Sequence, residues 1–245
     1  HLDTARERYE DWRARQLRLV EDDGESGGLI ARARGVLENP DDRIRPEALA
    51  AAVDAVAAED AIFTSDTGMA TVWLSRFVTM RGTRRLLGSY NLGSMANAMP
   101  QALGAQALDR SRQVVAFCGD GGLTMLLGDL ITAVSHELPV RFVVFDNGRL
   151  GMVKLEQEQG GLPEFGTELK NPDLAAVARA MGLHGVRVEA PDQLEAGVRE
   201  AFAAPGPSLL DVVTNPDEVA VPGKVHLGEA WGFAIAKARE TLESR

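Results

Sequence analysis

The hydrophobic positions of this chain fall into short apolar runs that alternate with stretches of helical periodicity. Two runs, at 114–118 and 140–145, are bounded by turn residues and enclose a stretch, 122–136, whose apolar positions recur at helical spacing. Two strands joined by a helix in this way run parallel. The alternation continues in both directions, with strands predicted at 61–65, 186–188 and 208–213 and helices at 46–59, 69–80, 96–108, 172–181 and 192–202. It predicts the α/β class: a doubly wound, mostly parallel sheet with helices on both faces.

The two ends of the chain differ from this central pattern. Residues 2–20 form a charged stretch with helical character, and EDDGESGG at 21–28 is typical of a flexible linker. We therefore expect residues 1–40 to be the exit helix and linker of a preceding domain. Residues 41–245 are long enough for one α/β domain, which we expect to end in an amphipathic helix at 228–245.

Small and acidic residues follow both strands of the central unit. The first strand leads into Gly119-Asp120-Gly121-Gly122, and the second leads into Asp146-Asn147-Gly148. Parallel strands bring such loops to the same carboxyl edge of the sheet, where open α/β folds bind their ligands. A glycine-rich loop at a helix start binds phosphate, but a carboxylate within it repels phosphate unless a divalent cation lies between the two.

The residue types at this edge suit Mg²⁺, which prefers oxygen ligands. Asp120 offers a carboxylate, Asn147 offers a side-chain carbonyl oxygen, and Arg149 offers its backbone carbonyl. Asp-Gly and Asn-Gly are also common turn dipeptides, so either of them alone indicates a plain turn. The full succession of strand, GDGG, helix, strand and DNG favours a metal-bridged diphosphate site instead.

Composition narrows the classes of partner. The formal net charge of −10 disfavours nucleic acid and anionic membranes. The single cysteine, Cys118, cannot form an internal disulfide. The sequence shows neither a signal peptide nor an apolar run long enough to span a bilayer, so we expect a cytoplasmic protein.

Three segments carry a resemblance to a known family: LLGSYNLGSMANAMPQALGAQ at 86–106, GDGGLTMLLGDL at 119–130 and VVFDNGRLGMV at 143–153. From about 45 to 238 the chain resembles the carboxyl-terminal, diphosphate-binding domain of thiamine diphosphate-dependent enzymes. Within this family it is most similar to the bacterial pyruvate dehydrogenase (quinone), or pyruvate oxidase, group. The resemblance implies thiamine diphosphate and Mg²⁺ as cofactors, FAD on another domain of the parent enzyme, and pyruvate or a similar 2-keto acid as substrate. The parent enzyme would convert pyruvate to acetate and CO₂ and pass the electrons through flavin to a quinone.

The resemblance also implies that the chain is part of a longer protein. Family members carry a pyrimidine-binding domain, whose glutamate reaches the cofactor of a neighbouring subunit, and a flavin-binding domain. We therefore expect the chain alone to be inactive and the parent enzyme to be a homo-oligomer, either a dimer or a tetramer. The lipid-binding segment at the end of the resembled enzyme has no obvious counterpart in ETLESR, so peripheral membrane contact of the parent enzyme stays an open question.

Site residues follow from the same resemblance. Met95 stands where the family places an apolar wedge that bends the cofactor, and the Gly93 carbonyl is expected to accept a hydrogen bond from the aminopyrimidine. A methionine that only fills the core is the alternative for Met95. The metal ligands are Asp120, Asn147 and the backbone oxygen of Arg149. Further cofactor contacts are expected from Ser94, Gly121, Gly122, Gly148, Leu150, Gly151, Met152 and Val153, and residues 150–153 open a helix.

Other interpretations remain open at this stage. Asp66-Thr67-Gly68 follows an earlier strand, where it either lines the same crevice or caps the next helix. Glu156 and Glu158 lie in a charged helical stretch and are expected to face solvent. The functional alternatives are an acetolactate synthase-like enzyme, another 2-keto acid decarboxylase, and a non-catalytic binding or assembly module. An NAD-binding domain is disfavoured because Asp120 lies inside the phosphate loop.

Overall fold

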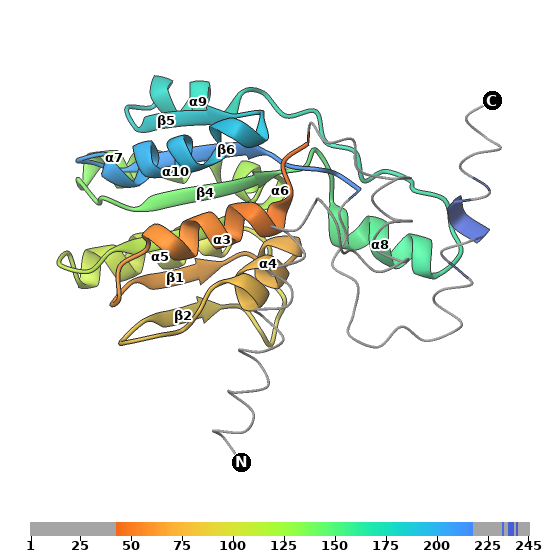
Figure 1. The fold of residues 1–245 in the computed structure, drawn as a ribbon, viewed down its shortest axis with the longest axis horizontal. Coiled ribbons are helices and arrows are strands. Elements are labelled where there is room, and N and C mark those ends of the chain that lie inside the picture. The colour runs from red at the N-terminus through yellow and green to blue at the C-terminus, as the bar shows by residue number, and fades with distance from the viewer. Residues whose placement is uncertain (1–42, 218–231, 233–234, 238, 240–245) are drawn as a thin grey trace, which may run out of the picture.

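The computed structural model describes residues 43–217, 232, 235–237 and 239. Within these residues, six strands form one sheet in which every pair is parallel (Figure 1). The strands are β1 (Ile62–Ser65), β2 (Arg85–Gly88), β3 (Val114–Gly119), β4 (Arg141–Asp146), β5 (His184–Val188) and β6 (Ser208–Val213). The α-helices are α3 (Pro46–Val56), α4 (Met69–Phe77), α5 (Ala98–Leu108), α6 (Asp120–Met125), α7 (Leu130–Ser135), α8 (Gly151–Gln159), α9 (Leu174–Ala180) and α10 (Leu194–Ala203), and the 3₁₀ turns are η1 (Leu127–Asp129) and η2 (Pro191–Gln193).

The spatial order of the strands is β2-β1-β3-β4-β6-β5. The chain first moves from β1 to β2 and then returns across β1 to β3, so the direction of winding reverses between β1 and β3. The segments that leave these two strands diverge and open a crevice at the carboxyl edge, where doubly wound sheets bind ligands. The expected fold class is confirmed, and its topology places the crevice beside Asp66 and Asp120.

Helices cover both faces of the sheet, and they bury the central strands from both sides. Because alternate residues of a strand point to opposite faces, Phe117 and Phe145 pack with α3, α4 and α10, whereas Phe142 packs with α5, α7 and α9. Figure 1 shows the sheet between these helices. Burial of one such side chain contributes about 1.5–3 kcal/mol. The sheet is therefore a firm base for the loops at its edge.

The helix expected at 122–136 is interrupted in the structure. It divides into α6, η1 and α7 because Leu126 leaves the helical region (φ −122°, ψ 27°) and the poor helix former Gly128 follows. The start of the helix also differs, since α6 begins at Asp120 directly after the extended residue Gly119. The edge strand β2 was not expected as a strand, because its residues are only half-buried or exposed and form no apolar run.

Two expectations fall on the ends of the chain. The exit helix and linker at 1–40 lie outside the described residues, so this division of the chain stays a prediction. Of the helix expected at 228–245, residues 232, 235–237 and 239 are described, and they are helical.

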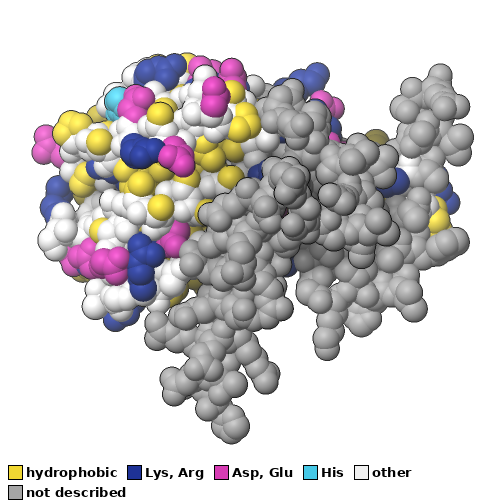
Figure 2. All heavy atoms as spheres, in the orientation of Figure 1, with side chains coloured by type: hydrophobic (Ala, Val, Ile, Leu, Met, Phe, Trp, Pro, Cys, Tyr) yellow, Lys and Arg dark blue, Asp and Glu magenta, His cyan; other side chains and the backbone are white. Residues whose placement is uncertain are grey.

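No helix in the described part of the chain combines the length and apolar character needed to cross a bilayer. Figure 2 shows acidic, basic and hydrophobic side chains intermixed over the face that α3 and α10 cover.

Candidate cofactor and metal site

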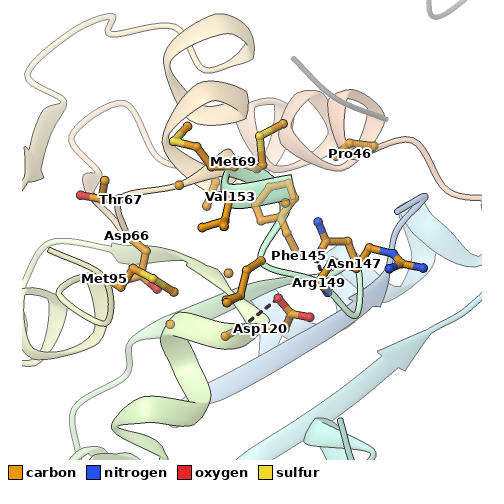
Figure 3. A pocket seen from close by; sticks show the side chains of 18 of the residues that line it. Pro46, Asp66, Thr67, Met69, Met95, Asp120, Phe145, Asn147, Arg149 and Val153 are labelled. Atoms are coloured by element: carbon orange, nitrogen blue, oxygen red, sulfur yellow. Dashed lines mark hydrogen bonds between the residues drawn. The ribbon is translucent and has the colours of Figure 1, made fainter. Parts of the chain in front are cut away.

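A cavity opens at the carboxyl edge of the sheet, among the segments that follow β1, β3 and β4 (Figure 3). Most residues of the predicted site line it: Gly93, Met95, Asp120, Gly121, Gly122, Asn147, Arg149, Leu150, Gly151, Met152 and Val153. Gly148 instead borders a neighbouring cavity that Asn147 also lines, and Ser94 lines neither of the two. The structure thus brings together three segments that are far apart in the sequence.

Asp120 lies at the base of this cavity with 2% of its surface exposed. Its Oδ1 accepts a hydrogen bond from the backbone N–H of Gly121 at 2.9 Å. Its Oδ2 accepts two, from the backbone N–H of Gly148 at 2.8 Å and from Nδ2 of Asn171 at 2.7 Å. Burial raises the pKa of Asp120 to about 7, and the charge of Asp146 adds to this rise, while the bonds from Gly121 and Asn171 oppose it.

These surroundings fit a divalent cation. Among the described residues no lysine or arginine forms an ion pair with Asp120, so no cationic side chain compensates its buried charge. Asn147 lines the same cavity, and its Oδ1 accepts one bond, from the backbone N–H of Arg149 at 3.0 Å. One oxygen of each side chain therefore retains an acceptor position, as Mg²⁺ ligands require. The described residues contain no group of three acidic, histidine or cysteine side chains placed to hold a metal ion, so a third protein ligand has to be of another type, such as a backbone carbonyl.

The loop that carries Arg149 is held in place by its neighbours. Leu150 N–H bonds the Thr167 carbonyl at 2.8 Å, and Leu169 N–H bonds the Gly148 carbonyl at the same distance. The guanidinium of Arg149 pairs with Glu164, which directs the side chain away from the metal ligands. The helix α8 begins directly afterwards at Gly151, and its first residues line the cavity, so this helix start suits an anion such as a diphosphate.

The glycines of the GDGG loop permit close packing. A Cβ on Gly122 would lie 2.2 Å from Oδ2 of Asp66 and 3.3 Å from the backbone nitrogen of Ala96. A Cβ on Gly121 would lie 2.9 Å from a methyl group of Leu150. A side chain at Gly122 would therefore displace Asp66, whereas one at Gly121 would require only that the end of the Leu150 side chain move.

Asp66 links β1 to the segment that carries Gly93 and Met95. Its Oδ1 accepts a hydrogen bond from the N–H of Ala98 at 2.8 Å, while its buried Oδ2 has no hydrogen-bond partner in the described chain. Burial raises the pKa of Asp66 to about 6 against the opposing effect of nearby backbone N–H groups. Of the two interpretations of Asp66-Thr67-Gly68, lining of the crevice is confirmed. Capping is wrong, because Gly68 is the N-cap of α4 and no side chain caps it.

The segment with Gly93 and Met95 has an unusual backbone. Gly93 (φ 63°) and Ala96 (φ 60°) both adopt left-handed conformations, which a non-glycine residue rarely does. Met95 is 38% exposed and faces the cavity, so the alternative that it fills the core is wrong (Figure 3). Its role as the wedge stays a prediction.

The structure adds residues to the site that the sequence did not single out. Trp73, Phe145, Thr214 and Asn215 also line the cavity. Thr214 and Asn215 directly follow β6, so the argument from parallel strand ends could have found them. Asn171 had no such signal, because it lies in an irregular segment before α9.

Comparisons with known proteins agree with this geometry. Residues 66–212 match the family described as "Thiamine pyrophosphate enzyme, C-terminal TPP binding domain", thiamine pyrophosphate being a synonym of thiamine diphosphate. The chain is 35% identical over 202 residues to the "putative thiamine pyrophosphate-containing protein YdaP" of Bacillus subtilis, which covers 82% of this chain and 35% of that protein. It is 30% identical over 215 residues to the mitochondrial acetolactate synthase catalytic subunit of Saccharomyces cerevisiae, with coverage of 85% and 31%. It is 32% identical over 162 residues to a probable acetolactate synthase large subunit of Methanocaldococcus jannaschii, with coverage of 65% and 27%.

The match therefore covers between 27% and 35% of the length of these curated relatives. The family match at residues 66–212 includes Asp66, Asp120 and Asn147, at the ends of β1, β3 and β4. The names of these relatives support the expected cofactor and point to acetolactate synthases, and they do not single out pyruvate oxidases. The chain belongs to the thiamine pyrophosphate enzymes, and residues 66–212 match their C-terminal cofactor-binding domain.

Proposed function

We propose that this chain forms the diphosphate- and metal-binding half of the active site of an enzyme that decarboxylates pyruvate and oxidises the product to acetate. The observation that carries the proposal is the convergence of Asp120, Asn147, Gly93 and Met95 on one cavity at the point where the sheet reverses its winding. The metal ligands and the residues expected at the aminopyrimidine thus lie within reach of a single extended cofactor.

Each residue has a task in this proposal. The side-chain oxygens of Asp120 and Asn147 and the backbone carbonyl of Arg149 hold Mg²⁺, and the first N–H groups of α8 bind the diphosphate. Gly93 accepts a hydrogen bond through its carbonyl, and Met95 supports the bent cofactor. Thiamine diphosphate, when bound, supplies a nucleophilic carbon and an electron sink for the decarboxylation.

A second subunit completes the site in this proposal. Tyr90 and Leu92 are 61% and 88% exposed, and they flank the Gly93–Met95 segment. Exposed apolar side chains beside a binding site favour a covering protein surface. We infer a homo-oligomer in which a pyrimidine-binding domain of the neighbouring subunit covers this segment.

The fate of the product separates two candidates. The likeness of residues 86–106 to the pyruvate oxidase group favours oxidation through FAD to a quinone. The names of the yeast and Methanocaldococcus relatives favour transfer to a second 2-keto acid, which gives an acetolactate-type product. The cavity wall of Phe145, Met152 and Val153 suits the small apolar acyl group that either reaction needs.

Product analysis of the full-length protein distinguishes these candidates. The protein is incubated with pyruvate, thiamine diphosphate, Mg²⁺ and FAD, with ferricyanide as electron acceptor. We expect one acetate, one CO₂ and two reduced acceptors per pyruvate, since pyruvate and water give acetate, CO₂, two protons and two electrons. Acetolactate as the main product would establish the second candidate. If no CO₂ is released from pyruvate or from other 2-keto acids, the protein is a non-catalytic module. The 245-residue chain alone is expected to release no CO₂.

A further inference from the structure

Asn171 joins the metal side of the cavity to a second carboxylate. It lies in the irregular segment between α8 and α9, and its amide Nδ2 donates two hydrogen bonds. One bond reaches Oδ2 of Asp120 at 2.7 Å, and the other reaches Oδ1 of Asp146, the last residue of β4, at 2.8 Å. A single neutral side chain therefore donates to two buried carboxylates.

The two carboxylates differ in their other partners. Oδ2 of Asp146 lies 3.7 Å from the guanidinium of Arg187, which also pairs with Asp211. Asp120 has no such partner among the described residues, and its remaining bonds come from the backbone. Asp146 thus has a cationic partner, which it shares with other carboxylates, whereas Asp120 has none among the described residues.

The pattern of accepted bonds distinguishes the two oxygens of Asp120. A carboxylate oxygen has two lone-pair positions. Those of Oδ2 are both occupied, by the N–H of Gly148 and by Asn171, whereas Oδ1 accepts only the N–H of Gly121. The oxygen with a remaining position is therefore Oδ1. A cationic side chain in place of Asn171 would compete with a metal for Asp120, and an apolar one would leave Oδ2 partly unsatisfied.

We propose that Asn171 is a positioning residue that orients Asp120, so that Oδ1 is the oxygen that binds the divalent cation. The proposal rests on the proposed function, because it assumes that Asp120 is a metal ligand. A purely local role in the chain is disfavoured, since α9 is capped by Asp173, whose Oδ1 accepts the N–H of Ala176 at 2.7 Å. Hydrogen-bond partners of metal ligands typically change metal affinity 10- to 100-fold when removed.

The test measures Mg²⁺ affinity separately from cofactor affinity. In the full-length protein, Asn171→Leu keeps the size of the side chain and removes both donors, and Asn171→Ala is a second variant without added bulk. Mg²⁺ is titrated calorimetrically at saturating thiamine diphosphate, and thiamine diphosphate is then titrated at saturating Mg²⁺. Asp173→Asn, which keeps an acceptor for the cap of α9, is the control for disturbance of this segment.

We expect Mg²⁺ to bind about 10- to 100-fold more weakly to both Asn171 variants, with cofactor affinity at saturating Mg²⁺ changed less than about threefold. The control should bind Mg²⁺ like the wild type. Unchanged Mg²⁺ affinity in either folded Asn171 variant, or an equal loss of both affinities, would overturn the proposal. A wild-type protein that binds neither ligand would instead refute the proposed function, and this inference with it.

Discussion

Asp120 and Met95 face the same cavity, yet their surroundings differ. Around Asp120, the metal side (Asp120, Asp146, Asn147 and Asn171) is buried or partly buried, and hydrogen bonds from Asn171 connect Asp120 to Asp146. Around Met95, the wedge segment (residues 89–96) is largely exposed and contains two residues with positive φ. The residues expected to hold the metal are therefore fixed by contacts within this chain, whereas the wedge segment has a surface that another protein part can cover. This difference in exposure fits an active site whose metal side belongs to one protein surface and whose wedge segment is covered by a second one.

Gly122 is the point where the two regions approach each other, so of the substitutions that probe this comparison its replacement should have the largest effect on stability. In Gly122→Ala, the new Cβ would meet Oδ2 of Asp66 and the backbone of Ala96, which joins the wedge segment to α5. We expect a loss of about 1–3 kcal/mol in the free energy of unfolding, as for other overpacked sites. We also expect at least a tenfold loss of cofactor affinity. Urea denaturation and calorimetry measure the two effects.

A matched glycine close by in the chain provides the control for this substitution. A Cβ on Gly128 would meet no atom within 4 Å, so Gly128→Ala should change the free energy of unfolding by less than about 0.5 kcal/mol. Equal effects at the two positions would show that the close approach of Asp66 to Gly122 does not link the two regions.

Asp66 should show a pH-dependent effect of intermediate size. Its pKa of about 6 in the folded chain exceeds the value of 3.8 for an unperturbed aspartate, so the folded state holds a proton more tightly than the unfolded state. The Asp66 carboxyl therefore contributes most to the free energy of unfolding below about pH 4, and this contribution is lost as the pH rises to about 6. The substitution Asp66→Asn keeps an acceptor for the N–H of Ala98 and removes the ionisable group. This variant should therefore be about 1–2 kcal/mol more stable than the wild type at pH 8.

Denaturant unfolding at pH 4, 6 and 8 tests this expectation. The difference between Asp66→Asn and the wild type should be near zero at pH 4 and should grow between pH 4 and 6. A difference that is the same at all three pH values would mean that the Asp66 carboxyl does not titrate in this window.

The smallest effect on stability is expected in the wedge segment. Because Met95 is already 38% exposed, Met95→Ala should lower the free energy of unfolding by less than about 1 kcal/mol. Met99→Ala, four residues later in the buried face of α5, should lower it by about 2–5 kcal/mol. In the full-length enzyme, Met95→Ala should nevertheless reduce kcat at least tenfold with a smaller change in cofactor affinity. Unchanged kcat would remove Met95 from the proposed site.

The sequence predicted those parts of the site that depend on regular structure. Parallel strands of similar register must bring their ends together, so Asp120 and Asn147 could be paired from the pattern of apolar runs alone. Asn171 reaches the same place from an irregular segment, whose path depends on tertiary packing that periodicity does not encode.

The structure differs from the sequence-based expectation at two further places, again because the expectation considered only local sequence. Glu156 is exposed, as expected, but Glu158 is buried and pairs with Lys237 at 2.8 Å, a partner 79 positions away. A charged helical stretch indicates a solvent-facing surface only when no distant segment packs on it. The break between α6 and α7 likewise depends on the local backbone at Leu126, which the apolar spacing of the stretch does not reveal.

The central claim is that Asp120 and Asn147 bind a metal that holds a diphosphate cofactor in this chain. Calorimetric titration of the full-length protein with thiamine diphosphate, in Mg²⁺ and in EDTA, tests it most directly when wild type and Asp120→Ala are compared. We predict binding by the wild type in Mg²⁺ and a loss of at least about 100-fold in EDTA or in Asp120→Ala, with the fold retained in circular dichroism. Equal cofactor affinity in all four measurements would contradict the account.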